Sequence, residues 1–163
     1  MPSDRTTGTQ TGLDGAAEWF RERLAGLATE PAREGMRAAA VETAPLTQGV
    51  MPPLYARDED ESYLLLEGEV EFHVGDERLR AAAGDVVVAP RGVARTFRVL
   101  SRRARWLVVT SVRSLAGYEA FGRAVALPLR GGGWASADEA AAVAAVAAAN
   151  GIDVLGPPGA LPA

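Results

Sequence analysis

The sequence of 163 residues contains no cysteine, no lysine and one histidine, His73, so all 17 of its basic residues are arginine. Without cysteine there can be no disulfide, thiolate nucleophile or cysteine metal site. Without lysine there can be no Schiff-base lysine and no lysine general base. A single histidine also cannot supply the two or three imidazoles of a histidine-based metal site. Any catalysis must therefore come from carboxylates, tyrosines, arginines, hydroxyl groups or His73.

The composition is that of an ordinary globular domain, with 48% hydrophobic and 23% charged residues. The net charge of −4 gives no electrostatic reason to expect a nucleic-acid partner. No apolar run approaches the roughly 20 residues that span a bilayer. Residues 1–12 are polar and lack the apolar core of a secretory signal. We therefore expect a cytoplasmic protein with no nucleic-acid partner and no membrane partner.

Helix signals lie at both ends of the chain. We predict a disordered N-terminus over residues 1–12 and a helical lead over residues 13–37, in which Asp14 caps an amphipathic helix. Residues 116–163 are predicted as C-terminal helices and a tail. In that segment residues 118–126 form a short helix, and a glycine hinge lies at 131–133. A longer helix starts at Ser136, where Glu139 completes a capping box, and ends near Asn150; the remaining residues form an extended tail.

Residues 38–115 are predicted to form the β-structured domain. Short apolar runs separated by glycine-containing turns predict strands at residues 63–66, 70–74, 85–89, 95–100 and 106–112. This spacing is typical of a mainly β sandwich or barrel rather than of alternating β and α units. Within residues 70–74 apolar and polar residues alternate. His73 is therefore expected on the face opposite Phe72, as a solvated strand histidine.

Two segments resemble the signature motifs of the cupin family. Residues 52–69, which include Tyr55-Ala56-Arg57 and Glu61, resemble the first motif, and residues 84–95, from Gly84-Asp85 through Pro90-Arg91-Gly92 to Arg95, resemble the second. The resemblance covers residues 38–156 and is to single-domain, quercetin-dioxygenase-like cupins. It implies one jelly-roll β-barrel flanked by an N-terminal helix and C-terminal helices. Because cupins commonly pair through edge strands, a homodimer is an expectation of the same resemblance.

The resemblance also implies where the metal ligands of the family would lie. Tyr55, Arg57 and Arg95 occupy the three histidine positions, and Glu61 occupies the glutamate position. Iron, manganese, nickel and zinc sites of this kind depend on neutral imidazole nitrogens. Arginine is cationic and offers no lone pair. We therefore expect no metal and no redox cofactor.

If the strands follow the family's register, these four side chains face the interior together with three aromatic residues. Two guanidiniums would favour a carboxylate, enolate or phenolate ligand, and a nearby arginine would favour the phenolate form of Tyr55 as a general base. Glu61 could act as base or acid, while Arg95 stabilises an enolate. The predicted catalytic residues are Tyr55, Glu61 and Arg95, and the predicted substrate-binding residues are Arg57, Tyr63, Phe97 and Trp106.

The predicted function is therefore a metal-independent cupin enzyme that performs acid–base chemistry, either isomerisation, cyclisation, dehydration or epimerisation. Its substrate would be a small anionic or enolisable molecule such as a polyketide-like biosynthetic intermediate. Three alternatives stay open. Arg57 or Arg95 could pair with Glu61 and plug the vacated site as a structural element. The protein could be a non-catalytic cupin that binds a small anion, or a metal-dependent dioxygenase with an unusual ligand set.

Overall fold

The computed structural model describes residues 9–10, 37–42, 46–112 and 136–163. The predicted helical lead at 13–37 lies almost wholly outside these residues, as do the predicted helix at 118–126 and the glycine hinge at 131–133. The described part of the chain is dominated by strands, which confirms the mainly β prediction.

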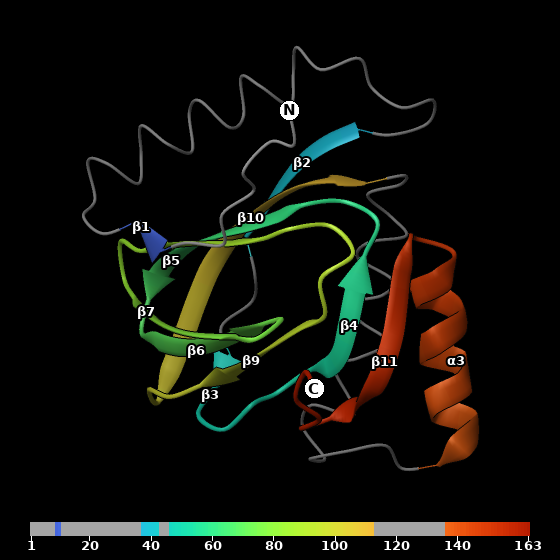
Figure 1. Cartoon of the computed structure of the whole chain (residues 1–163). Coiled ribbons are helices and arrows are strands. Elements are labelled where there is room, and N and C mark those ends of the chain that lie inside the picture. The colour runs from blue at the N-terminus through green and yellow to red at the C-terminus, as the bar shows by residue number, and fades with distance from the viewer. Residues whose placement is uncertain (1–8, 11–36, 43–45, 113–135) are drawn as a thin grey trace.

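The strands form two antiparallel sheets that face each other (Figure 1). The first sheet has the order β1 (Thr9–Gln10), β8 (Val86–Ala89), β5 (Glu61–Glu67), β10 (Arg103–Val112) and β2 (Arg37–Glu42), and β3 (Leu46–Thr47) also pairs with β10. The second sheet has the order β11 (Ile152–Pro158), β4 (Pro53–Arg57), β9 (Arg95–Val99), β6 (Glu69–Val74) and β7 (Glu77–Ala82).

The expectation of a closed barrel is corrected by this topology. Among the described strands, no ladder of hydrogen bonds joins one sheet to the other, so the architecture is a two-layer sandwich. From β4 to β6 and again from β7 to β10, each connection carries the chain from one sheet to the other. At Gly68, between β5 and β6, the chain turns this corner with a φ of +85°. Strands that follow each other in sequence therefore lie mostly in facing layers.

The five predicted strands correspond to β5, β6, β8, β9 and β10, with ends that differ by a few residues. Strand β7 was not predicted, because Glu77-Arg78-Leu79-Arg80 lacks an apolar run. Residues 152–158, predicted as part of an extended tail, instead form β11, which pairs with β4 along the edge of the second sheet. The prolines Pro157 and Pro158 fit this edge position, where one side of a strand needs no hydrogen-bond donor.

The hydrophobic core lies between the sheets. Alternation along the strands directs every second side chain inward, and the fully buried members include Leu65, Val70, Phe72, Val74, Val99, Trp106 and Val108. Phe97 and Trp106 meet edge-to-face with ring centroids 4.8 Å apart. As predicted, His73 lies on the face opposite Phe72. It is not freely solvated there, because its Nε2 lies 3.0 Å from Oε1 of Glu71 and its side chain is only 14% exposed.

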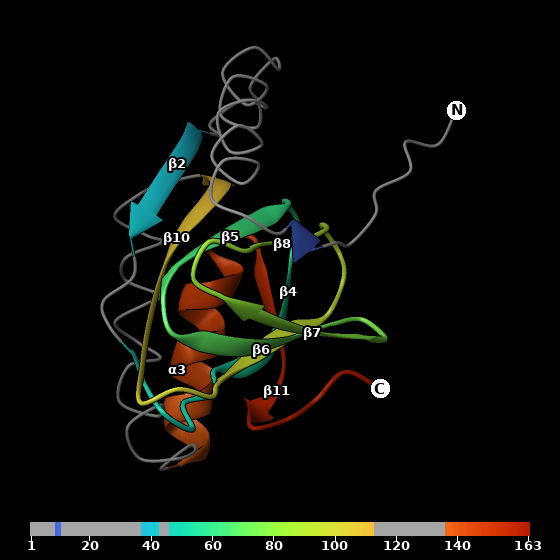
Figure 2. The ribbon, with the colours of Figure 1, turned by 90° about the vertical axis from the view of Figure 1, so that its left-hand side faces the viewer.

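Helix α3 (Ala137–Ala148) confirms the predicted helix after Ser136. The Ser136 hydroxyl accepts a hydrogen bond from the backbone N–H of Glu139 at 3.1 Å, as expected for an N-cap. The helix lies beside β11 (Figure 2), and Figure 1 shows both on the opposite side of the molecule from β6 and β7; the buried residues of the helix are Val143 and Ala147. No helix in the described ranges has the length and apolar character needed to cross a membrane.

Replacing Gly68 with alanine should destabilise the fold. The added Cβ would overlap the carbonyl oxygen of Arg103, in a backbone conformation that L-residues avoid. We expect Gly68→Ala to lower the free energy of unfolding by more than about 2 kcal/mol. Gly49 is the matched control, because its φ is +83° and nothing lies within 4 Å of an added Cβ. Gly49→Ala should cost only about 1 kcal/mol, the conformational part. Equal losses in urea unfolding would contradict the steric explanation.

Candidate functional site

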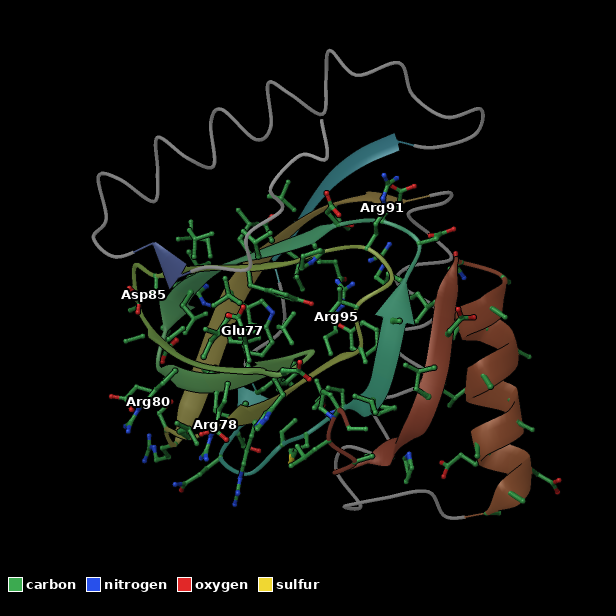
Figure 3. All side chains as sticks on the ribbon, viewed as in Figure 1. Glu77, Arg78, Arg80, Asp85, Arg91 and Arg95 are labelled. Carbon is green, nitrogen blue, oxygen red and sulfur yellow. The ribbon has the colours of Figure 1, made fainter. Side chains whose placement is uncertain are left out.

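Five predicted site residues come together between the sheets at the end where β4 passes into β5. Tyr55 and Arg57 share a face of β4 because they are two residues apart, and Glu61 and Tyr63 share a face of β5 for the same reason. Arg95 begins β9 directly opposite Tyr55 in the register of the second sheet. Figure 3 shows the Arg95 side chain in the interior, beside β4. Glu61 and Tyr63 thus belong to one sheet and the other three residues to the facing sheet.

The carboxylate of Glu61 is the centre of this group. Its Oε1 accepts a hydrogen bond from Nη1 of Arg57 at 2.8 Å. Its Oε2 accepts from the hydroxyl of Tyr63 at 2.7 Å, from Nη1 of Arg95 at 3.0 Å and from the hydroxyl of Tyr55 at 3.2 Å. Both oxygens therefore have donors, from three strands. We call Tyr55, Arg57, Glu61, Tyr63 and Arg95 the Glu61 cluster.

Arg95 has a second role in the turn between β8 and β9. Its Nη1 donates to the carbonyl of Ala89 at 3.0 Å, its Nη2 to that of Pro90 at 2.6 Å, and its Nε to that of Val93 at 3.2 Å. A guanidinium has five N–H groups in a fixed planar arrangement, and here four of them have acceptors. Arg95 therefore ties Glu61 to the backbone of the turn.

The two tyrosines connect the Glu61 cluster to two different parts of the core. The ring of Tyr63 lies 4.9 Å from that of Phe72 in the central core. The ring of Tyr55 belongs to a separate group that includes Ile152 of β11 and Ala147 of α3. Their hydroxyls are 3.1 Å apart. The cluster is thus held from the sandwich interior on one side and from α3 and β11 on the other.

The Glu61 cluster is buried, since the exposed fractions of its five residues lie between 2% and 7%. Burial raises the pKa of Glu61, but the charges of Arg57 and Arg95 and the hydrogen bond from Tyr63 outweigh it, so the pKa is lowered. Burial, with the negative charge of Glu61, raises the pKa of Tyr63 well above 10. At neutral pH the cluster therefore contains a carboxylate, a neutral phenol at Tyr63 and two guanidiniums.

Phe97 and Trp106, the other two predicted substrate-binding residues, lie in the core rather than in the hydrogen-bonded group. Phe72 separates them from Tyr63, with its ring centroid 6.1 Å from each. Asp60 is a further residue beside the site and is not among the predicted site residues. Its Oδ1 accepts a hydrogen bond from the backbone N–H of Arg91 at 2.8 Å and so joins two loops next to the Glu61 cluster. Only its position before Glu61 could have suggested this role.

The side chains at the positions that the cupin resemblance assigns to metal ligands do not fit a divalent metal. Glu61 is the only carboxylate among them, and both of its oxygens accept hydrogen bonds from guanidiniums. Arg57 and Arg95 offer no lone pair and would repel a cation. Within the described ranges, no three His, Cys, Asp or Glu side chains gather as a potential metal site.

The cupin resemblance is tested by a comparison with protein families. Residues 45–110 match the family model described as cupin domain. This segment is therefore similar to a cupin domain. It contains strands β4 to β9, most of β10 and every member of the Glu61 cluster. No protein of curated function matches the chain.

Several solved structures are similar to part of this chain. Procruciferin, an 11S globulin from Brassica napus, is 17% identical with a TM-score of 0.42, over 45% of this chain and 20% of that one. An uncharacterized conserved protein with a double-stranded β-helix domain from Klebsiella pneumoniae is 17% identical with a TM-score of 0.41, over 45% of this chain and 62% of that one. KdgF from Halomonas sp. is 19% identical with a TM-score of 0.42, over 51% and 82%. Similarity at this level carries no argument about activity.

Acid should weaken the fold through Glu61. Because its pKa is lower in the folded protein than its ordinary value of 4.5, its stabilising contribution is complete above that pH and is lost as pH falls through the folded value. We expect Glu61→Gln to lower the free energy of unfolding by about 3–5 kcal/mol at pH 7, because two buried guanidiniums lose their counter-charge. The difference from wild type should shrink as pH falls below 4.5.

The matched control is Glu71→Gln on the outer face of the second sheet, where the largely covered side chain of Glu71 pairs with His73 and with the exposed Arg78. It should cost about 1 kcal/mol or less. Urea unfolding between pH 3 and pH 7 measures both effects. A Glu61→Gln difference that does not change across this range would contradict the ionised state of Glu61.

Proposed function

We propose that this chain is a metal-independent cupin enzyme that performs acid–base chemistry on a small anionic or enolisable molecule. The observation that carries the proposal is the Glu61 cluster. In it two phenols and two guanidiniums each lie within hydrogen-bond distance of one buried carboxylate. Proton donors, a proton acceptor and cationic groups for a developing negative charge are the parts that isomerisation, cyclisation, dehydration or epimerisation needs.

Of the two predicted bases, Glu61 is better placed than Tyr55. The hydroxyl of Tyr55 donates to Oε2 of Glu61 at 3.2 Å, and a phenolate there would face a carboxylate of the same sign. In the resting cluster the arginines hold the pKa of Glu61 low, which makes it a weak base. An anionic substrate that draws Arg95 or Arg57 toward itself would weaken that pairing. Burial would then raise the pKa of Glu61, and substrate binding would itself activate the base.

The proton step needs no cofactor. Glu61 takes a proton from a carbon next to a carbonyl group of the substrate, and the electron pair of that C–H bond becomes the enolate. A guanidinium stabilises the enolate oxygen, and Tyr63, a neutral phenol, donates a hydrogen bond to it. The protonated Glu61 then returns the proton to another carbon of the substrate, which gives an isomer. Alternatively, the protonated Glu61 gives its proton to a hydroxyl group of the substrate, which leaves as water as the enolate collapses. For ring closure the enolate carbon attacks a second carbonyl carbon of the substrate, and the proton of Glu61 goes to the resulting alkoxide.

A second candidate, a non-catalytic cupin, is favoured by one observation. Arg95 uses three of its N–H groups on backbone carbonyls, which is what a structural plug would do. In that case Glu61 and its arginines hold the two sheets together and any anion binds without turnover. In either form we also propose that the protein is cytoplasmic and forms a homodimer. We further propose that it is of the quercetin-dioxygenase-like subtype with replaced histidines.

Proton abstraction can be measured without knowing the natural substrate. The purified protein is incubated in D₂O with a panel of small enolisable carboxylic acids, including 3-oxo acids and aryl-substituted 2-oxo acids, and deuterium incorporation next to the carbonyl group is followed by NMR. We expect protein-dependent incorporation for at least one acid. Glu61→Gln should slow it by about a hundredfold or more, because it removes the base.

Glu71→Gln, which changes a carboxylate outside the Glu61 cluster, is the control and should leave the rate unchanged. Incorporation at the wild-type rate in Glu61→Gln would contradict the assignment of the base. Saturable shifts of the Arg95 Nε–H signal with no incorporation for any acid would instead support the non-catalytic cupin. Stoichiometric iron, nickel or manganese in the active protein would overturn the metal-independent mechanism.

A further inference from the structure

The Glu61 cluster is buried, yet one short surface segment lies directly against it. This segment is the turn of residues 90–93, between β8 and β9, which we call the 90–93 turn. Arg91 and Gly92 at its tip are exposed. Arg95, two residues beyond the turn, reaches back under it into the interior (Figure 3). A ligand that reaches Glu61 from this side must displace the turn.

The 90–93 turn is held from inside by the side chain of Arg95. Arg95 donates to the carbonyls of Pro90 and Val93 in the turn and to that of Ala89 just before it. The same guanidinium donates to Glu61. Movement of the turn therefore changes the acceptors available to Arg95 and, through Arg95, the pairing of Glu61.

Two backbone N–H groups of the turn donate hydrogen bonds to the end of β4 and to the loop that connects β4 to β5. The N–H of Arg91 donates to Oδ1 of Asp60 at 2.8 Å, and the N–H of Gly92 donates to the carbonyl of Arg57 at 2.7 Å. Asp60 directly precedes Glu61, and the backbone carbonyl of Asp60 accepts a hydrogen bond from the hydroxyl of Thr110 at 2.7 Å. The acceptor of Arg91 is therefore fixed to the first sheet.

We propose that the 90–93 turn is the gate of the Glu61 cluster and that Asp60 is the positioning residue that keeps it closed. The inference rests on the proposed function, because a gate matters only if a ligand reaches Glu61. Opening the turn takes the carbonyls of Pro90 and Val93 away from Arg95 and leaves its N–H groups facing the entrance. An entering carboxylate replaces them with charge-assisted hydrogen bonds, which are stronger than those to carbonyls. The ligand thus holds the gate open.

The proposal is tested on the ligand-free protein with three variants. Asp60→Ala removes the acceptor of the Arg91 N–H, whereas Asp60→Asn keeps an oxygen in the same place. Asp85→Ala is the matched control, because Oδ2 of Asp85 also accepts a backbone N–H at 2.8 Å, that of Ala82. Asp85 precedes β8, at the opposite end of that strand from the 90–93 turn, and Figure 3 shows it far from Arg91 and Arg95.

Two readouts report on the gate. Amide hydrogen exchange of Arg91 and Gly92 should be about fivefold to tenfold faster in Asp60→Ala, the effect of losing one hydrogen bond. Nitration of Tyr55 and Tyr63 by tetranitromethane, mapped by mass spectrometry, should accelerate to a similar degree. Asp60→Asn should restore both rates, and Asp85→Ala should change neither at equal loss of overall stability.

Unchanged exchange and nitration in Asp60→Ala would overturn the gate, and so would equal acceleration in Asp85→Ala, since that indicates general loosening. The two proposals fail separately. If the D₂O experiment shows Glu61-dependent proton abstraction but Asp60→Ala behaves as wild type, the gate is wrong and the enzyme proposal stands. If the variants behave as expected but no acid shows incorporation or binding, the function is wrong and the turn is a mobile cover of a structural cluster.

Discussion

The carboxylate of Glu61 joins the two sheets by charge, and the rest of the site depends on it. Glu61 stands on β5 of the first sheet, while Arg57 and Arg95 reach it from β4 and β9 of the second. Such a buried ion pair gives little net stability over a well-packed apolar core, because desolvation offsets the attraction. Losing one partner is costly, however, since a charge then stays buried alone. The stability of the sandwich therefore depends on keeping these charges paired.

The need to keep these charges paired explains the hydrogen bonds around Glu61. Two guanidiniums need more acceptors than one carboxylate can provide, and Arg95 finds them in the carbonyls of Ala89, Pro90 and Val93. The turn after β8 is thus shaped by the demand of a buried cation. Tyr63 adds a neutral donor that lies against the aromatic core, and Tyr55 adds one that lies against β11 and α3. Both sheets therefore contribute donors to this carboxylate, and Tyr55 links it to α3.

Much of the fold followed from local pattern, and the membership of the site followed from the cupin resemblance. Short apolar runs between turn signals predicted the strands that carry Tyr63, Phe72 and Phe97. The resemblance implied that Tyr55, Arg57, Glu61 and Arg95 would lie together. Strand β7 could not be predicted, because its outward arginines interrupt the apolar pattern. The sequence also could not predict the separation into two sheets or the acceptors of Arg95, because both depend on how distant segments pack. The place of Phe97 and Trp106 in the core, behind Phe72, depends on that packing too.

A metal ion and a guanidinium can each keep a buried glutamate ionised, because both supply positive charge. In this chain Arg57 and Arg95 do so for Glu61 between the two sheets. A metal ion does so through lone pairs of fixed ligands, whereas a guanidinium does so through N–H groups that can exchange one acceptor for another. The N–H groups of Arg95 already donate both to Glu61 and to backbone carbonyls. A carboxylate ligand competes for the same N–H groups, so the cation that holds the resting site together is also the group that an anionic substrate would recruit.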